Sequence, residues 1–289
     1  MKNTPQTPLA FDLGGRSVRL FRGGELKLDG GAMFGIIPKP LWERTTPADD
    51  KNRITLACNC LLVESADSDR RVLVETGHGD KYDEKQRRIF GIDPAHWVKP
   101  ALRDAGVEPD TISDVVLTHL HFDHAGGLTR LDGEHVATTF PKATAHVQRA
   151  ELRDARANFG IMTESYRDEN LTPLDDAQAW NELDGECEIV PGIHAMLTPG
   201  HTRGHQSIVI AGADRTLVYT GDVMPTAAHV GAPWNMAYDL QPLDNRASKH
   251  KLLSAAAERD WILIIDHELT TPAVTVARER DWFGLVPIR

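Results

Sequence analysis

Imidazole and carboxylate side chains are concentrated in one short segment, which directly follows the apolar run 115–117. The segment holds His119, His121, Asp123 and His124 within six residues. In an extended chain alternate side chains point to the same side, so His119 and His121 can bind one metal ion together. The chain then turns, and Asp123 and His124 can reach a second ion beside the first. Neutral imidazole and carboxylate are ligands of zinc and similar ions, so the pattern favours a metal site over a histidine-rich surface loop.

Three further stretches place a metal-binding side chain just beyond an apolar run that predicts a strand. His201 lies in P-G-H-T-R-G-H, Asp222 in T-G-D, and His267 in D-H. A lone histidine at a strand end is more often structural than functional. Four strand ends that each supply such a group predict a site held rigidly by the scaffold and open on one side.

The bulk composition is that of an ordinary globular protein, with 289 residues available to bury a core. The net charge of -10, from 42 acidic and 32 basic side chains, disfavours nucleic acid as a partner. Cys58, Cys60 and Cys187 cannot all pair, and the first two share one predicted strand, so we expect reduced thiols and a cytoplasmic location. Residues 1–8 lack a signal-peptide core, and no apolar run has the length of a membrane span.

The elements that must position these motifs are strands alternating with helices. Apolar residues at 18–21 predict a strand, Gly23-Gly24 a turn, and residues 26–28 the return strand of a hairpin. Apolar spacing and end signals predict three helices, over residues 93–105, 148–157 and 245–258. Because no repeat or linker interrupts the pattern, we expect one domain over residues 1–289.

The motifs T-H-L-H-F-D-H, P-G-H-T-R-G-H, T-G-D and D-H, in this order, resemble those of the metallo-β-lactamase superfamily over nearly the whole chain. The resemblance implies an α/β fold, an αβ/βα sandwich of two mixed sheets covered by helices on the outside. It also implies two divalent metal ions, zinc first, although manganese, cobalt, nickel and iron also accept nitrogen and oxygen donors. The implied ligands are His119, His121 and His201 for one ion, and Asp123, His124 and His267 for the other, with Asp222 bridging both.

Two residues beside the implied ligands have open roles. Glu75 stands where the family usually has an aspartate that supports a ligand through a hydrogen bond, and its longer side chain can still reach such a partner. His205, in P-G-H-T-R-G-H, is predicted either to orient a ligand or to stabilise its own turn.

The resemblance also indicates which reactions of the superfamily this chain can catalyse. Two-zinc β-lactamases place a cysteine where this chain has Asp222, and the added motifs and basic surfaces of the RNA-processing branches are not found. Segments 31–35, 221–229 and 234–239 are similar to the branch with quorum-quenching N-acyl homoserine lactonases and methyl parathion hydrolase. We therefore expect a dinuclear metal-dependent hydrolase, in which a hydroxide bridging the metals attacks a lactone or ester carbonyl.

Asp123 and Asp222 are the predicted catalytic residues. Asp222 holds both ions, and Asp123 is either a ligand alone or also a proton source for the leaving alkoxide. An aryl-ester or phosphotriester hydrolase with the same site is the alternative function. A redox protein with an iron pair, or a metal-binding module without turnover, is less favoured, because the iron-pair branch commonly has glutamate where this chain has His121.

The expected partner is a small-molecule lactone or ester with an apolar tail, and a homodimer is compatible with the sequence. The residues predicted to line the substrate pocket are Met33, Phe34, Trp42, Phe122, His229 and Trp234. The alternative for this set is packing in the core. Met236 and Tyr238 are likewise expected either to pack in the core or to line the pocket.

Overall fold

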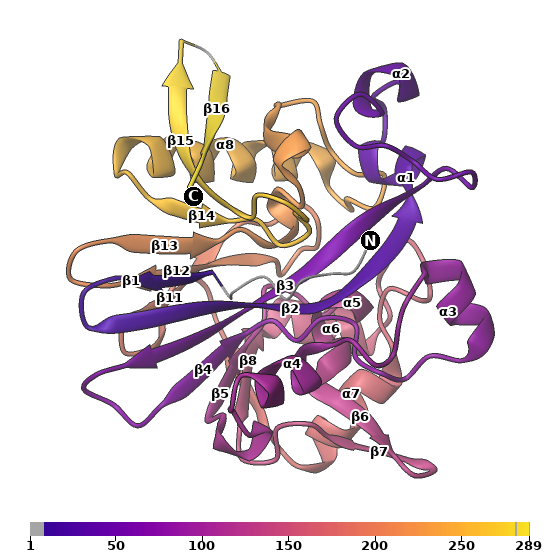
Figure 1. Ribbon diagram of the computed structural model, residues 1–289, viewed down its shortest axis with the longest axis vertical. Coiled ribbons are helices and arrows are strands. Elements are labelled where there is room, and N and C mark those ends of the chain that lie inside the picture. Colours follow the sequence, from indigo (N-terminus) through magenta and orange to yellow (C-terminus); the bar gives the residue numbers. More distant parts are fainter. Residues whose placement is uncertain (1–8, 281, 289) are drawn as a thin grey trace.

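The computed structural model describes residues 9–280 and 282–288, which form two seven-stranded mixed sheets and a small hairpin (Figure 1). In spatial order, the first sheet contains β1 (Ala10–Asp12), β2 (Arg16–Asp29), β3 (Arg53–Ser65), β4 (Arg71–Val74), β5 (Asp114–Val116), β8 (Thr144–Gln148) and β9 (Trp180–Leu183). The second contains β10 (Glu188–Val190), β11 (Ile193–Leu197), β12 (Gln206–Ala211), β13 (Thr216–Tyr219), β14 (Ile262–Ile264), β15 (Ala273–Glu279) and β16 (Trp282–Pro287). The hairpin consists of β6 (Thr129–Asp132) and β7 (His135–Thr138).

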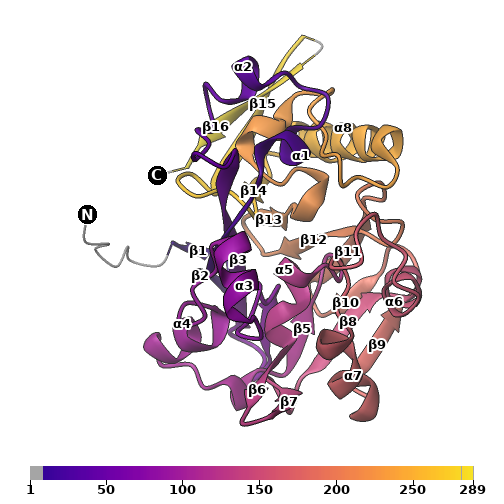
Figure 2. The same cartoon turned by 90° about the vertical axis from the view of Figure 1, so that its right-hand side faces the viewer.

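Helices α4 (Val98–Asp104), α6 (Arg149–Arg156), α7 (Asp168–Asp176) and α8 (Pro242–Glu258) lie on the outer sides of the two sheets, and α5 (Phe122–Ala125) lies near the centre of the molecule (Figure 2). The other α-helices are α1 (Gly30–Phe34), α2 (Lys39–Trp42) and α3 (Glu84–Phe90). Short 3-10 turns are η1 (Pro109–Thr111), η2 (Gly126–Leu128), η3 (Gly221–Val223) and η4 (Ala227–Val230). Helices α4, α6 and α7 share a core with the first sheet, and α8 shares one with the second. These layers confirm the predicted αβ/βα sandwich.

Strand β3 illustrates how the sequence builds this sandwich. Leu61 and Val63 pack between the two sheets, whereas Cys60 and Leu62 pack against the outer helices. Successive side chains of a strand point to opposite faces, so a strand covered on both sides is apolar throughout. Cys58 and Cys60 are buried and free, as expected from their spacing on one strand.

The predicted hairpin at Gly23-Gly24 is wrong. Strand β2 runs without a turn from Arg16 to Asp29, and its register against β3 shifts between Arg22 and Glu25. The two glycines therefore form a β-bulge, and Gly24 has a φ of 121° with the ring of His78 packed where a side chain would lie. A bulge and a turn use the same residues, so the sequence pattern does not separate them.

The predicted helices occur with shifted boundaries. Helix α6 lies within the predicted range 148–157, and α8 begins three residues before the predicted start, at Pro242. Helix α4 begins only at Val98, because Asp93 caps a preceding turn through the N–H of Ala95 instead of starting the helix. The prediction of one domain also covers residues 1–8, 281 and 289, which lie outside the described residues, and it stays a prediction.

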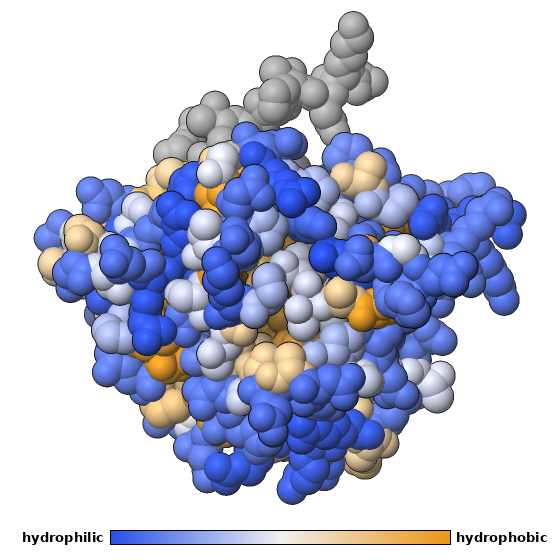
Figure 3. Space-filling model, turned by 90° about the horizontal axis from the view of Figure 1, so that it is seen from below, coloured by the Kyte–Doolittle hydropathy of each residue, from blue (hydrophilic) through white to orange (hydrophobic). Residues whose placement is uncertain are grey.

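The surface is mainly polar. On the face in Figure 3 hydrophilic side chains predominate, and hydrophobic ones are scattered or in small groups. None of the helices formed by residues 9–280 and 282–288 combines the length and the apolarity that a bilayer crossing requires.

A buried ion cluster ties the parallel strands together. The carboxylate of Asp114 on β5 accepts hydrogen bonds from Arg70 at 2.8 and 3.1 Å and from Ser113 at 2.7 Å. Nε2 of His146 on β8 lies 2.9 Å from Asp114, and its Nδ1 accepts from Asn181 on β9. Burial raises the pKa of Asp114, but these hydrogen bonds outweigh burial and hold the pKa below its ordinary value of 3.8.

This cluster predicts a pH-dependent loss of stability in Asp114→Asn. Because the pKa is lower in the folded than in the unfolded chain, the stabilisation is complete above about pH 4 and is lost as the pH falls through the folded-state pKa. The variant should lose about 2 kcal/mol of unfolding free energy at pH 7, and less in acid. Urea denaturation of both proteins across this range measures the difference; a difference that does not change with pH would contradict the assignment.

Candidate metal centre

The predicted ligands come from the ends of four strands in both sheets. His119, His121, Asp123 and His124 follow β5, His201 follows β11, Asp222 lies in η3 after β13, and His267 follows β14. All seven side chains are buried. The structure thus brings together residues up to 148 positions apart, counted from His119 to His267 (267 − 119).

The first group consists of three imidazoles. Ligand atoms of His119, His121 and His201 all lie within 4.8 Å of one another. Nδ1 of His121 is 2.9 Å from Nε2 of His201, and Oδ2 of Asp222 is 3.2 Å from that same Nε2. Three converging ring nitrogens beside a carboxylate oxygen can bind one divalent ion.

The second group lies on the other side of Asp222. Oδ1 of Asp222 is 3.2 Å from Nε2 of His267, and Oδ2 is 3.6 Å from Nε2 of His124. Asp123 faces the same place, with Oδ2 3.6 Å from Nε2 of His267. Asp222 therefore stands between the two groups, which is the position that the resemblance implies for a bridging ligand.

Unpartnered atoms in this cluster test whether the residues fit a pair of metal ions. Nε2 of His119, Nε2 of His124 and Oδ1 of Asp222 are buried without a hydrogen-bond partner. A buried polar atom without a partner costs about 1–3 kcal/mol, and coordination to a cation would satisfy each of these atoms. Nitrogen and oxygen donors at these separations fit two divalent ions; their identity as ligands stays a prediction.

The cluster separates neutral from charged imidazoles. Burial, together with the neighbouring imidazoles, puts the pKa values of His119 and His121 well below the ordinary 6.5. Burial also lowers the pKa of His267, but the carboxylates of Asp266 and Asp222 outweigh it and raise the pKa to about 10. Cationic groups are therefore stabilised on the side of the cluster where the carboxylates gather, and divalent ions meet the same demand.

Hydrogen bonds hold the imidazoles from behind. Nδ1 of His201 is 2.9 Å from Oδ1 of Asp239, and Nδ1 of His267 donates to the carbonyl of Ala57 at 2.6 Å. Such bonds fix the ring orientation of His201 and His267. Nδ1 of His124 makes no hydrogen bond but lies 3.0 Å from Oδ2 of Asp266, which is an ion-pair distance. Asp266 contacts the nitrogen of His124 that points away from Asp222, so we assign it this supporting role although it lies close enough to be a ligand.

Glu75 and His205 contact the segments that carry the predicted ligands, and both accept a main-chain N–H there. Oε1 of Glu75 accepts the N–H of Thr118 at 2.6 Å, and Oε2 lies 3.2 Å from Nδ1 of His124. The longer side chain therefore does reach a predicted ligand. Nε2 of His205 accepts the N–H of Asp222 at 2.9 Å, and burial lowers the pKa of His205 to about 3, so the ring is a neutral acceptor. Gly221 has a φ of 58° and packs against this ring, where a side chain would collide.

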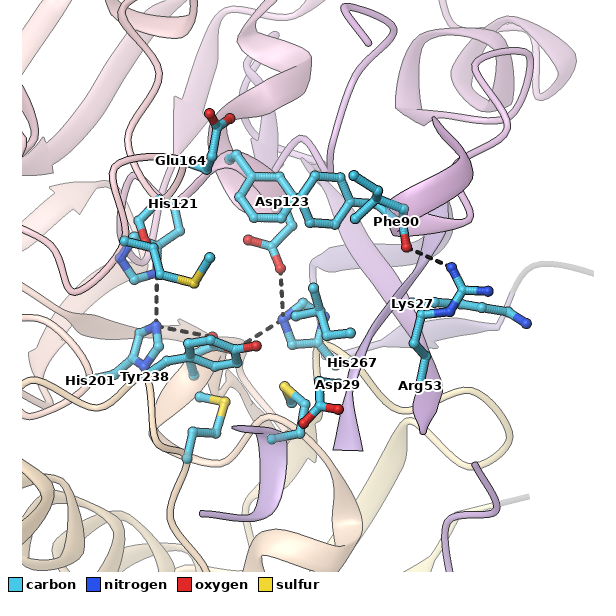
Figure 4. A pocket seen from close by; sticks show the side chains of 18 residues that line it. Lys27, Asp29, Arg53, Phe90, His121, Asp123, Glu164, His201, Tyr238 and His267 are labelled. Carbon is cyan, nitrogen blue, oxygen red and sulfur yellow. Dashed lines mark hydrogen bonds and ion pairs between the residues drawn. The ribbon is translucent and has the colours of Figure 1, made fainter. Parts of the chain in front are cut away.

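A cavity of about 230 Å³ opens onto the cluster (Figure 4). His121, Asp123, His201, Asp222 and His267 line it, and its other walls are largely apolar. The apolar and aromatic residues among these walls are Leu28, Met33, Ile89, Phe90, Phe122, Met162, Met236 and Tyr238.

The predicted pocket residues divide between this cavity and the core. Met33 and Phe122 line the cavity, as do Met236 and Tyr238. Phe34, Trp42 and His229 do not line it, because they are buried in an aromatic stack behind Met33, with ring centroids 5.1 Å apart for Phe34 and Trp42 and 4.9 Å apart for Phe34 and His229. Trp234 packs edge-on against Phe34 and lines a different cavity. For these four residues the core alternative describes the structure better.

Residues that sequence reasoning missed fall into two sets. Ile89 and Phe90 line the cavity, yet they lie in a segment whose pattern gave no functional signal. Met162 also lines it and lies in the weakly patterned stretch 158–184, which is typical either of an active-site cover or of helices with unclear ends. Asp239 lies in the segment 234–239 and Asp266 in the motif D-H, without a role having been assigned to either residue. An aspartate next to a predicted ligand, as in D-H, was the signal that could have found Asp266.

A model of the Metallo-beta-lactamase superfamily matches residues 53–267, which contain all seven predicted ligands. Among curated proteins, an N-acyl homoserine lactonase from Bacillus sp is 37% identical over 161 residues, covering 52% of this chain and 57% of the relative. A probable metallo-hydrolase from Mycobacterium tuberculosis is 28% identical over 184 residues, covering 58% of this chain and 57% of the relative. The chain thus spans 57% of the length of these relatives.

Solved structures match over a larger share of the chain. A probable metal-dependent hydrolase from Staphylococcus aureus has a TM-score of 0.86 at 30% identity, over 96% of this chain and 99% of that one. AidC, a dizinc quorum-quenching lactonase, has a TM-score of 0.78 over 98% of this chain and 97% of its own. At 19% identity the second likeness shows a shared fold alone.

The contact between His201 and Asp239 predicts the effect of Asp239→Asn. An amide in place of the carboxylate weakens the hold on Nδ1 of His201, so affinity for Zn²⁺ should fall about 10–100-fold. Competition with a chromogenic chelator measures this affinity, and Asp69→Asn, at an exposed position in the turn before β4, is the matched control. Equal affinities in the two variants would contradict the supporting role of Asp239.

Proposed function

The chain belongs to the metallo-beta-lactamase superfamily, and from that premise we propose that it is a dinuclear metal-dependent hydrolase that opens N-acyl homoserine lactones. The observation that carries the proposal is the convergence of seven buried imidazole and carboxylate side chains on one apolar-walled cavity. The free, buried thiols of Cys58 and Cys60 favour the reducing cytoplasm as the place where the enzyme works.

The substrate class is inferred from two independent features. Curated relatives that match the chain include N-acyl homoserine lactonases from several Bacillus species. The cavity combines a polar side, formed by the predicted ligands, with apolar walls suited to an acyl tail. An aryl ester would also meet apolar walls, and a substrate panel separates these classes.

Two divalent ions bound by these residues would activate water as a nucleophile at neutral pH and polarise the carbonyl oxygen. Lactone opening adds one water: its oxygen joins the carbonyl carbon, the ring C–O bond breaks, and the alkoxide that leaves takes a proton. The carboxylate of Asp123 lines the cavity beside His267, so it is placed to hold the proton released by water and to return it to the alkoxide.

Tyr238 is a candidate donor to the substrate. In the view of Figure 4 its ring lies between His201 and His267, and all three residues line the cavity. Burial raises the pKa of Tyr238 to about 12, so the phenol keeps its proton at neutral pH. It can therefore donate a hydrogen bond to a carbonyl or amide oxygen of a bound substrate.

The proposed activity predicts ring opening of an N-acyl homoserine lactone by the zinc-loaded protein. Mass spectrometry should detect the ring-opened acid, which is 18 Da heavier because one water has been added. Asp222→Ala should lower kcat/KM about 1,000-fold or more, because both groups of imidazoles lose their shared carboxylate.

The exposed variant Asp69→Ala is the control for this loss and should keep wild-type turnover. Nitrophenyl esters and an organophosphate triester are assayed in parallel. Turnover of these compounds by fully metal-loaded protein, without turnover of any acyl homoserine lactone, would replace the proposed substrate with the alternative.

The apolar wall predicts a selective effect of Phe90→Ala on long substrates. Phe90 pairs with Phe122 at a ring-centroid distance of 5.2 Å, and both rings line the cavity. Loss of about 1.5 kcal/mol of apolar contact should raise KM about 10-fold for a decanoyl lactone and much less for a butanoyl lactone. Leu243→Ala, on the exposed side of α8, is the control. The same change in KM for both chain lengths would contradict an acyl tail lying against Phe90.

A further inference from the structure

One buried carboxylate outside the predicted ligand set contacts two ligand-bearing segments at once. Glu151 on α6 is fully buried. Its Oε1 accepts hydrogen bonds from the main-chain N–H of Leu120 and from the hydroxyl of Tyr166, each at 3.0 Å. Its Oε2 accepts one from the hydroxyl of Thr202 at 2.6 Å.

Each of the three donors adjoins a predicted ligand of the first group. Leu120 lies between His119 and His121 in the chain, and Thr202 directly follows His201. The ring of Tyr166 packs on that of His121, with centroids 4.9 Å apart. Glu151 therefore touches the neighbours of all three imidazoles without being placed among the predicted ligands.

Burial raises the pKa of Glu151, whereas its three hydrogen-bond donors favour the ionised carboxylate. A carboxylate offers acceptor sites only, and here three donors point at its two oxygens. Hydrogen bonds to an ionised acceptor are about twice as strong as neutral ones, so these bonds restrain the two segments firmly. In Glu151→Gln the amide has the same shape, but its NH₂ group would face at least one of these donors and could not accept a hydrogen bond from it.

The two segments meet at the ligands themselves. Nδ1 of His121 lies 2.9 Å from Nε2 of His201, although the residues are 80 positions apart. Glu151 accepts a main-chain hydrogen bond from Leu120 in one segment and a side-chain hydrogen bond from Thr202 in the other. These two bonds fix the distance between the segments. Ligand groups must lie within about 0.5 Å of their productive positions for a site to function.

Further contacts between α6 and the 201–205 segment do not involve the carboxylate of Glu151. Arg203 makes two hydrogen bonds of 2.7 Å to Asp154, one turn further along α6. Gly204 packs directly on the backbone of Glu151, where any side chain would collide. The segment would thus stay docked on α6 if the carboxylate of Glu151 alone were changed, which makes its specific role measurable.

We propose that Glu151 is a positioning residue, whose carboxylate sets the separation of His121 and His201 and thereby the affinity and geometry of the first metal site. The inference rests on the proposed metal centre. It concerns how that centre is held and adds no new ligand.

The test is a Co²⁺ titration of the metal-free protein, followed by its visible absorption and by chelator competition. In Glu151→Gln the affinity for one of the two ions should fall about 10–100-fold, and the absorption band of that ion should shift. Asp154→Asn is the matched control on the same helix and should lower stability without changing the Co²⁺ spectrum. Glu151→Asp keeps the charge and should restore part of the affinity.

Milder variants keep the proposal testable if Glu151→Gln does not fold. Thr202→Val and Tyr166→Phe each remove one donor and should shift the same absorption band by a smaller amount. A wild-type spectrum and affinity in Glu151→Gln, or equal changes in Glu151→Gln and Asp154→Asn, would overturn the positioning role alone. Wild-type protein that binds no Co²⁺ would overturn the metal centre and this role together.

Discussion

The structure depends on holding the carboxylate of Asp222 in the interior, between the two groups of imidazoles. Oδ2 lies near His201 of the first group and His124 of the second, and Oδ1 faces His267. An ionised carboxylate in the interior is costly unless cationic groups or hydrogen bonds surround it. Burial acts to raise the pKa of Asp222, but the neighbouring imidazoles outweigh burial and hold the pKa well below 3.8. The sandwich meets this demand by ending strands of both sheets at one edge.

The imidazoles around Asp222 are supported by a further layer of buried polar groups. The imidazoles are held from behind by Asp239, Asp266 and a main-chain carbonyl, and the segments that carry them are tied to Glu75 and Glu151. Each support is itself buried, so a change in one of them reaches the ligands without touching a substrate. Most of the apolar walls belong to other segments, around α1, α3, residue 162 and residues 236–238, whereas Phe122 lies between His121 and Asp123. Most of the cavity wall can therefore change without changing a predicted ligand.

The layers of the fold were predicted through the family resemblance that the motifs carry, whereas the convergence of the ligand-bearing segments was predicted from local patterns. Apolar runs followed by histidine or aspartate mark strand ends, and strand ends meet at sheet edges. The supporting carboxylates were beyond such patterns. Glu151 meets Thr202 across 51 positions, and Asp239 meets His201 across 38, so only the packed structure pairs them. The apolar segment 31–42 was ambiguous for another reason, since Met33 lines the cavity and Phe34, next to it, is in the core.

The central claim is that residues from four strand ends hold two divalent ions on either side of Asp222. Anomalous diffraction from a Zn²⁺-soaked crystal, recorded on both sides of the zinc absorption edge, tests it most directly. We expect two peaks about 3.5–4 Å apart, one beside His119, His121 and His201 and the other beside His124 and His267. A single peak, or zinc bound only away from Asp222, would contradict it.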